Sequence, residues 1–139
     1  SSQELLSTIK TIHRDCAIAS FDVDADLVHC HTWYSHFAGI LIKLLYGIPL
    51  VVTVHSLEPM RPWKAEQLGR GYAYSTWVEK TALEMADAVI AVSESTKRDL
   101  LRHFHISPSK ITVIHNGIDL DIYQISSALG RGLGNRIVV

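Results

Sequence analysis

The sequence has few cysteines and no marked excess of either charge. Its two cysteines, Cys16 and Cys30, have neither metal-motif spacing nor the number that a disulfide framework needs, so we expect a reduced, cytoplasmic protein. The sequence contains 13 Lys and Arg residues and 14 Asp and Glu residues, which gives a net charge of -1, and no basic run exceeds two residues. This balance argues against a protein that binds nucleic acid or an anionic membrane.

Long hydrophobic segments and internal repeats are also missing. The longest apolar stretch, residues 37–45, contains Lys43 and is too short to span a bilayer. The first residues show no basic start followed by an apolar run, so we expect no signal peptide. Hydrophobic residues nevertheless make up 47% of the 139 residues, and the mean hydropathy is +0.15. The chain therefore has the size and apolar content of one folded domain.

The hydrophobic pattern alternates between helical and strand periods. Amphipathic helices are expected at residues 2–19, 33–46, about 72–86 and about 93–104, and strands at 27–31, 50–55, 88–92 and 111–115. In the third helix, Tyr74, Trp77 and Met85 repeat at helical spacing, and we expect this stripe in the core. Strands that alternate with long helices predict a Rossmann-like parallel α/β sheet with right-handed crossovers and helices on both faces.

The last residues have a different composition. Residues 130–134 read Gly-Arg-Gly-Leu-Gly, but no strand precedes them and no helix follows, so they do not indicate a phosphate-binding loop. We predict a Rossmann-like domain over residues 1–125. Residues 126–139 would be a flexible linker or the truncated start of a second domain.

The segment of residues 55–72 is unusually polar for its place after a buried strand. Six charged or imidazole side chains are crowded into it: His55, Glu58, Arg61, Lys64, Glu66 and Arg70. Two prolines and the pair Gly69 and Gly71 prevent one long helix. We predict a long functional loop. The alternative is a solvated surface loop whose charges pair with one another.

Each predicted strand ends at polar residues. These are His31, His55, Ser93, and His115 followed by Asn116. The carboxyl ends of parallel strands share one edge of the sheet, where ligands bind. Imidazoles, hydroxyls and an amide at this edge, with Arg61, Lys64 and Arg70 nearby, predict a cleft for a polyhydroxylated substrate that bears a phosphate. For any single histidine, a structural hydrogen bond is still the commoner role.

Two other chemistries have weaker support. His29 and His31 point to the same face of a strand and His36 is close in sequence, which is a partial zinc pattern. However, His36 belongs to a helix that heads away, and no carboxylate or cysteine completes the set, so we expect neither a metal nor a cofactor. No nucleophile-elbow motif indicates a hydrolase.

Four stretches taken together resemble glycosyltransferase family 4. They are residues 26–34, 55–72, 86–93 and 113–119, and the resemblance extends over about residues 24–123. The short Ala-Val-Ser and Asn-Gly-Ile-Asp pieces are individually unspecific. The long segment of residues 55–72 is the specific part, and it looks most like the glycogen synthase branch, which includes actinobacterial α-maltose-1-phosphate synthases.

The resemblance implies a GT-B enzyme that transfers glucose from ADP-glucose or UDP-glucose, with retention and without a metal. The acceptor would be an α-glucan or glucose 1-phosphate, held mainly by the N-terminal domain. His31 matches the catalytic histidine beside the transferred sugar, where it could stabilise an oxocarbenium-like transition state. The implied substrate-binding residues are His55, Glu58, Arg61, Lys64, Tyr72, Ser93 and Asn116.

The resemblance covers only part of such an enzyme. The family's opening strand with its glycine-rich loop is absent before Ser1, and the nucleotide-binding domain is absent after Tyr123. We therefore expect a partial acceptor-side domain that is inactive without the C-terminal domain and could form oligomers through an exposed sheet edge. A non-catalytic module that binds carbohydrate or sugar phosphate, or a family 4 transferase of another sugar, are the alternatives.

Overall fold

The computed structural model describes residues 2–118, and the predicted linker over residues 126–139 lies outside this range. All four predicted helices and all four predicted strands are present, with ends that differ by a few residues. In chain order the elements are α1 (Ser2–Ala19), β1 (Val28–Cys30), α2 (Trp33–Tyr46), β2 (Leu50–Val54), η1 (Glu58–Met60), α3 (Trp63–Leu68), α4 (Arg70–Met85), β3 (Ala88–Ala91), α5 (Glu94–His103), η2 (Pro108–Lys110) and β4 (Ile111–Val113).

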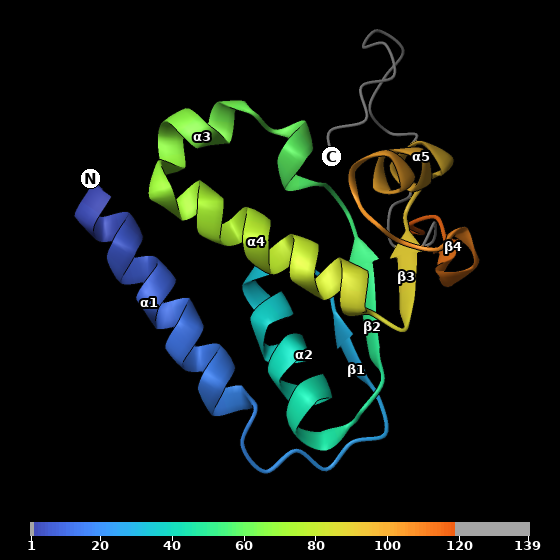
Figure 1. Ribbon diagram of the computed structural model, residues 1–139, viewed down its shortest axis with the longest axis horizontal. Coiled ribbons are helices and arrows are strands. Elements are labelled where there is room, and N and C mark those ends of the chain that lie inside the picture. Colours follow the sequence, from blue (N-terminus) through green and yellow to red (C-terminus); the bar gives the residue numbers. More distant parts are fainter. Residues whose placement is uncertain (1, 119–139) are drawn as a thin grey trace, which may run out of the picture.

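The four strands form one parallel sheet in the order β1-β2-β3-β4. This confirms the predicted Rossmann-like α/β architecture. The connecting helices α2, α4 and α5 pack against the same sheet face, whereas the prediction placed helices on both faces (Figure 1). Successive strands are added at the same edge of the sheet, so right-handed crossovers place each connecting helix on the same face.

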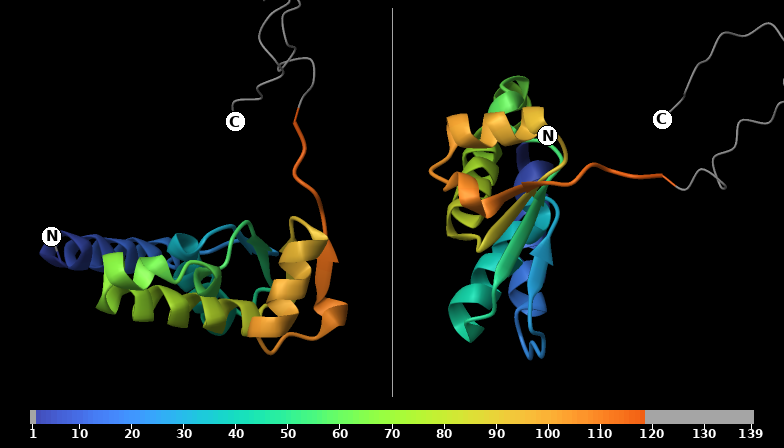
Figure 2. Two further views of the ribbon diagram at one scale, coloured as in Figure 1. Left: turned by 90° about the horizontal axis from the view of Figure 1, so that it is seen from above. Right: turned by 90° about the vertical axis from the view of Figure 1, so that its right-hand side faces the viewer.

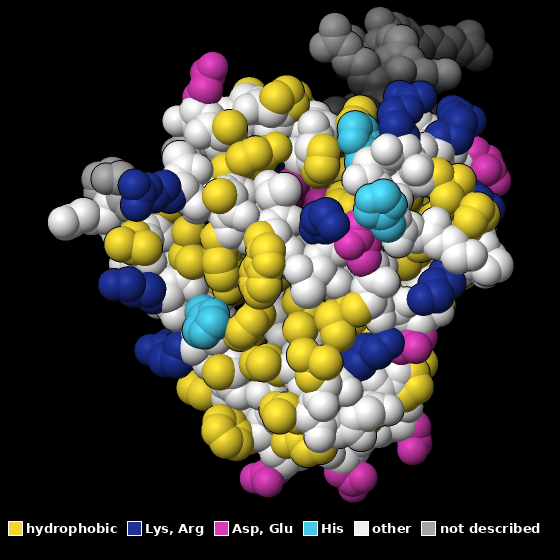
Figure 3. Space-filling model, in the orientation of Figure 1, with side chains coloured by type: hydrophobic (Ala, Val, Ile, Leu, Met, Phe, Trp, Pro, Cys, Tyr) yellow, Lys and Arg dark blue, Asp and Glu magenta, His cyan; other side chains and the backbone are white. Residues whose placement is uncertain are grey.

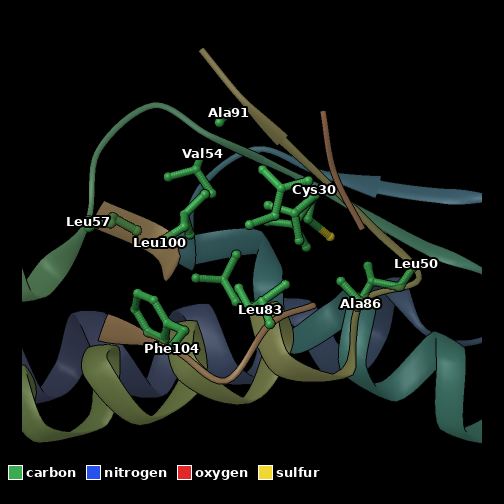
Figure 4. Packing of buried hydrophobic residues seen from close by; sticks show 13 residues of the cluster. Cys30, Leu50, Val54, Leu57, Leu83, Ala86, Ala91, Leu100 and Phe104 are labelled. Carbon is green, nitrogen blue, oxygen red and sulfur yellow. The ribbon is translucent and has the colours of Figure 1, made fainter. Parts of the chain in front are cut away.

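The core lies between this sheet face and the helices. Leu50 and Val54 of β2 face Leu83 of α4 and Leu100 and Phe104 of the α5 region (Figure 4). All five side chains are buried, and their burial is the main source of stability. Since alternate strand residues face the core, the opposite face of β2 carries the remaining side chains.

Helix α2 approaches the sheet closely at Gly39. A Cβ at this position would lie 2.7 Å from Cys30 Sγ and 2.8 Å from Leu50 Cδ1, closer than packed atoms allow. Helix α1 then packs on α2 and α4, at the opposite end of the molecule from α5 and β4 (Figure 2). One contact between these helices is the stacked pair His13 and Phe37, with ring centroids 4.4 Å apart.

The predicted aromatic stripe of α4 is only partly in the core. Trp77 is 54% exposed, so its predicted burial is wrong. The buried stripe of α4 instead consists of Ser75, Val78, Glu79, Ala82 and Leu83. The two polar residues of this stripe, Ser75 and Glu79, occupy core-facing positions because both form hydrogen bonds with Glu58, while the large indole of Trp77 stays in solvent. Within residues 2–118, no helix is both long and apolar enough to cross a membrane.

The polar segment of residues 55–72 is more regular than the predicted loop. It contains the single turn η1, the short helix α3 and the start of α4. Gly69 separates α3 from α4 with a φ of 51°, a left-handed conformation that glycine adopts without strain. The prolines and glycines therefore interrupt one long helix as expected, but they leave short helical turns rather than an open loop.

Candidate functional site

A pocket of about 130 Å³ opens at the carboxyl ends of β1 and β2, where the start of α2 faces η1 and α3. Figure 3, which shows the face covered by α4, has histidine, acidic and basic side chains close together at its upper right, over the region of α5. The pocket is lined by His31, Thr32, Trp33, Tyr34, His36, Thr53, Val54, His55, Ser56, Glu58, Arg61, Lys64 and Glu79. The structure therefore brings together five of the eight predicted site residues: His31, His55, Glu58, Arg61 and Lys64.

Three histidines form a row across the ends of β1 and β2. The rings of His29 and His31 are stacked with centroids 4.3 Å apart, and His31 Nδ1 lies 3.3 Å from His55 Nε2. His29 Nε2 lies 2.7 Å from Thr53 Oγ1. Burial, and secondly the nearby His31 ring, lower the pKa of His29. One of the two facing nitrogens of His31 and His55 must carry a proton and the other accept it, so the pair can share a proton at the pocket wall.

Glu58 is a buried anchor rather than an exposed ligand. Its carboxylate accepts hydrogen bonds from Lys64 Nζ at 2.9 Å and from Ser75 Oγ at 3.1 Å. Its backbone N–H donates to Glu79 Oε1 at 3.0 Å, and Tyr72 Oη donates to its carbonyl at 3.1 Å. These bonds tie η1 to α3 and α4. Tyr72 therefore supports the pocket from outside its lining.

Glu79 lies beneath this anchor and is almost fully buried. Burial raises its pKa to about 7, with the Glu58 backbone hydrogen bond acting in the opposite direction and the Glu58 charge adding to the increase. A carboxyl group that titrates near neutral pH at the base of a pocket can hold or release a proton there.

The burial of Glu79 leads to a prediction about stability. Between about pH 4.5 and 7 the folded protein keeps the Glu79 proton that the unfolded chain has lost, so this group's stabilisation is lost as pH rises. Glu79→Gln keeps a neutral side chain, and its free energy of unfolding relative to wild type should increase over this window by about 3 kcal/mol. Urea unfolding of both proteins at several pH values measures this difference.

His36, whose pKa is lowered to about 4 by burial, changes the free energy of unfolding with pH in the opposite direction. This contribution is the same in both proteins, so it cancels in the difference between variant and wild type. The exposed Glu66→Gln variant is the matched control and should follow wild type at every pH. A Glu79→Gln curve parallel to wild type would show that Glu79 is ionised in the folded protein throughout the window.

Arg61 and Lys64 are the two basic side chains in the pocket lining. The Arg61 guanidinium donates to Ser56 Oγ, whereas Lys64 forms the ion pair with Glu58. The alternative of internal charge pairing therefore holds for Lys64. Within the described residues, the Arg61 side chain forms a hydrogen bond to the Ser56 hydroxyl, and its guanidinium retains further donors toward the pocket.

His36 lines the pocket, although the sequence predicted no role for it. It is 3% exposed, and neither ring nitrogen has a hydrogen-bond partner within the described part of the chain. Burial lowers its pKa to about 4, so the ring is neutral at physiological pH. A buried imidazole with unused nitrogens beside a pocket is available to a ligand. Its place in the first turn of a helix that follows a strand was the signal that could have found it.

The sequence did not predict Glu79 as a site residue, because its role depends on a partner that is distant in the chain. Its spacing from Ser75 and from Leu83 places it on the buried stripe of α4. A carboxyl group at such a position requires a partner, and only the packing of η1 against α4 shows that the partner is the Glu58 amide.

Two predicted site residues lie away from this pocket. Ser93 caps α5, with its Oγ accepting a hydrogen bond from the Thr96 N–H at 3.0 Å. Asn116 is exposed beyond β4 and is not part of the lining. His115, at the same strand end, has Nδ1 3.1 Å from the Val92 carbonyl. The roles predicted for Ser93 and Asn116 in substrate binding stay predictions.

The described residues contain no group of three or more His, Cys, Asp or Glu side chains placed to hold a metal ion. His29 and His31 share a face, as their spacing predicted, but they stack on each other. Cys30 points into the core, where its thiol contacts the Ser35 carbonyl.

Comparison with known proteins places the chain in a family. The family described as Glycosyltransferase Family 4 matches residues 7–122. The chain is 57% identical over 100 residues to an alpha-maltose-1-phosphate synthase of Mycolicibacterium smegmatis, a match that covers 71% of this chain and 26% of that protein.

Other relatives cover similar parts of the chain. An alpha-maltose-1-phosphate synthase of Mycobacterium tuberculosis is 49% identical over 118 residues, which are 84% of this chain and 30% of that protein. A D-inositol 3-phosphate glycosyltransferase of Corynebacterium aurimucosum is 32% identical over 104 residues, which are 74% of this chain and 25% of that protein. The chain thus spans less than a third of the length of these relatives.

Proposed function

Because this chain belongs to glycosyltransferase family 4, we propose that it supplies the acceptor side of a retaining glucosyltransferase of the α-maltose-1-phosphate synthase type. The donor would be ADP-glucose or UDP-glucose. The observation that carries the proposal is the pocket in which Arg61 and Lys64 face the histidines at the ends of β1 and β2. Imidazoles beside two cations suit a hydroxyl-rich ligand that carries a phosphate.

The names of the relatives agree with such a ligand. One group is named for maltose 1-phosphate and the other for inositol 3-phosphate, so a phosphate ester is common to both. Glucose 1-phosphate as acceptor is the version that we propose for this chain. A neutral α-glucan is the second acceptor, since the resemblance to the glycogen synthase branch implies one.

In this proposal the basic side chains bind the phosphate, and the other pocket residues contact or position the sugar. Arg61 can form two parallel hydrogen bonds to a phosphate, and Lys64 adds a point charge. His31 and His55 would face the sugar and its reacting hydroxyl. Glu58 would act as a positioning residue, because its buried carboxylate holds Lys64 at the pocket wall.

Replacement of both cations tests the assignment of the phosphate. In the full-length enzyme, Arg61→Ala combined with Lys64→Ala should raise the KM for glucose 1-phosphate at least about tenfold, equivalent to about 1.4 kcal/mol. The KM for a neutral glucan should rise by a much smaller factor, because a glucan offers no charge to either side chain. Steady-state kinetics with the two acceptors give the comparison.

Lys64 needs a control for stability, because its loss leaves Glu58 buried without a counter-charge. The single variant Arg61→Ala avoids this problem, and Lys80→Ala removes an exposed lysine of α4 that lies outside the pocket lining. Equal losses on the two acceptors in Arg61→Ala would mean that Arg61 maintains the shape of the segment, and the phosphate assignment would be wrong.

A non-catalytic module that binds sugar phosphate is the alternative, and the short span of the match to each relative keeps it open. It shares the pocket and the cations with the main proposal. Catalysis by the full-length protein separates the two, because a binding module would bind glucose 1-phosphate without turnover.

A further inference from the structure

A second pocket, of about 250 Å³, lies between the η1–α3 segment and α5. It is lined by Ser56, Leu57, Met60, Arg61, Trp63, Thr96 and Asp99. Ser56 and Arg61 line both pockets, so the two pockets are adjacent.

Leu57, Met60 and Trp63 form the apolar wall of the second pocket. Trp63 is 58% exposed and Met60 is 45% exposed, although both belong to the lining. An exposed indole at the mouth of a pocket offers a flat apolar surface with one N–H donor. A sugar ring has such a complementary surface, because its axial C–H groups form an apolar face while its hydroxyls lie around the rim.

The polar residues of the second pocket suit hydroxyl groups rather than a phosphate. Asp99 and Arg61 provide one charge of each sign, and Lys64 is not part of the lining. A carboxylate accepts hydrogen bonds from hydroxyls and repels a phosphate. The Thr96 hydroxyl is held in place because its Oγ1 lies 2.9 Å from Oγ of Ser93, the residue that caps α5.

We propose that the second pocket binds a neutral glucosyl ring of an α-glucan, with Trp63 stacked on the ring and Asp99 and Thr96 bound to its hydroxyls. This inference rests on the proposed function for the class of ligand. It adds a subsite for a glucan chain next to the pocket that takes the sugar phosphate. The predicted cleft role of Ser93 then becomes indirect, since Ser93 positions Thr96.

Titration of the full chain with maltohexaose tests the subsite. Trp63→Ala should weaken maltohexaose binding at least tenfold, and Asp99→Asn should weaken it several-fold, as measured by calorimetry. Trp77→Ala is the matched control, because Trp77 is 54% exposed on α4 but lines neither pocket, and its binding should equal that of wild type. In ¹⁵N-labelled wild-type protein, the indole N–H signal of Trp63 should shift on titration while that of Trp77 stays in place.

The outcomes separate this inference from the proposed function. Absence of maltohexaose binding in wild type, unchanged binding in Trp63→Ala, or equal weakening in Trp77→Ala would overturn the subsite. Glucose 1-phosphate is titrated into the same proteins, and its affinity should be the same in wild type and Trp63→Ala. Glucose 1-phosphate binding without maltohexaose binding would refute the subsite alone, whereas the reverse result would support the subsite and refute the phosphate pocket.

Discussion

Replacement of His31 by alanine in the full-length enzyme should lower kcat by about a hundredfold or more, the usual cost of losing one group that stabilises transition-state charge. The KM for the acceptor should change little. His31 directly follows β1, and its Nδ1 lies 3.3 Å from His55 Nε2, so one edge of its ring is fixed by another imidazole. We propose that its role is strongest when positive charge develops at the anomeric carbon, and such a role appears in kcat rather than in KM.

His115→Ala is the matched control for this variant. His115 also follows a strand of the sheet, but its Nδ1 contacts the Val92 carbonyl and it does not line the pocket. Its kcat should equal that of wild type. An unchanged kcat in His31→Ala would remove His31 from the reacting centre, and a rise in acceptor KM alone would make it a binding residue.

The second large effect concerns the 139-residue chain on its own, which should show no measurable glucosyl transfer. The chain spans 26% to 30% of its alpha-maltose-1-phosphate synthase relatives. The family resemblance implies that the groups that bind the nucleotide diphosphate belong to a second domain. Loss of each such group costs roughly 3 kcal/mol of transition-state stabilisation, so loss of all of them abolishes turnover.

Release of nucleoside diphosphate from ADP-glucose or UDP-glucose, with glucose 1-phosphate as acceptor, measures this activity. Binding of glucose 1-phosphate by the same preparation shows that the acceptor pocket is folded. Turnover by the purified chain at a rate near that of a full-length relative would refute the assignment of this chain to the acceptor side alone.

Much of the fold follows from local sequence patterns. Two kinds of pattern were sufficient to predict helices and strands: the period of 3.6 over residues 2–19 and 33–46, and the apolar runs before His55 and Ser93. They were sufficient because each element's hydrophobic face is encoded within its own residues. The parallel orientation of the strands also followed, since strands that alternate with helices of this length favour β-α-β crossovers, whereas the order of the strands came from the structure. The strand ends at His31 and His55 therefore met at one pocket as expected.

Burial of individual side chains was harder to predict from periodicity. The stripe of α4 has two possible faces, and the spacing of Trp77 fits one while that of Glu79 fits the other. Packing selected the face with Glu79, because the Glu58 amide of a segment 21 residues away satisfies its carboxyl group. A charged residue can be buried only when such a distant partner is present.

The sequence was enough to place the strands, the helices and the polar strand ends, because hydrophobic periodicity and turn chemistry act over a few residues. The tertiary structure alone decided that Lys64 binds Glu58, that His36 lines the pocket with no hydrogen-bond partner among residues 2–118, and that Trp63 stays exposed in the same pocket lining as Asp99. Each of these outcomes depends on which element packs against η1 and α3. Such contacts join residues that are distant in the chain, and their energies appear only when the backbone has brought the partners together.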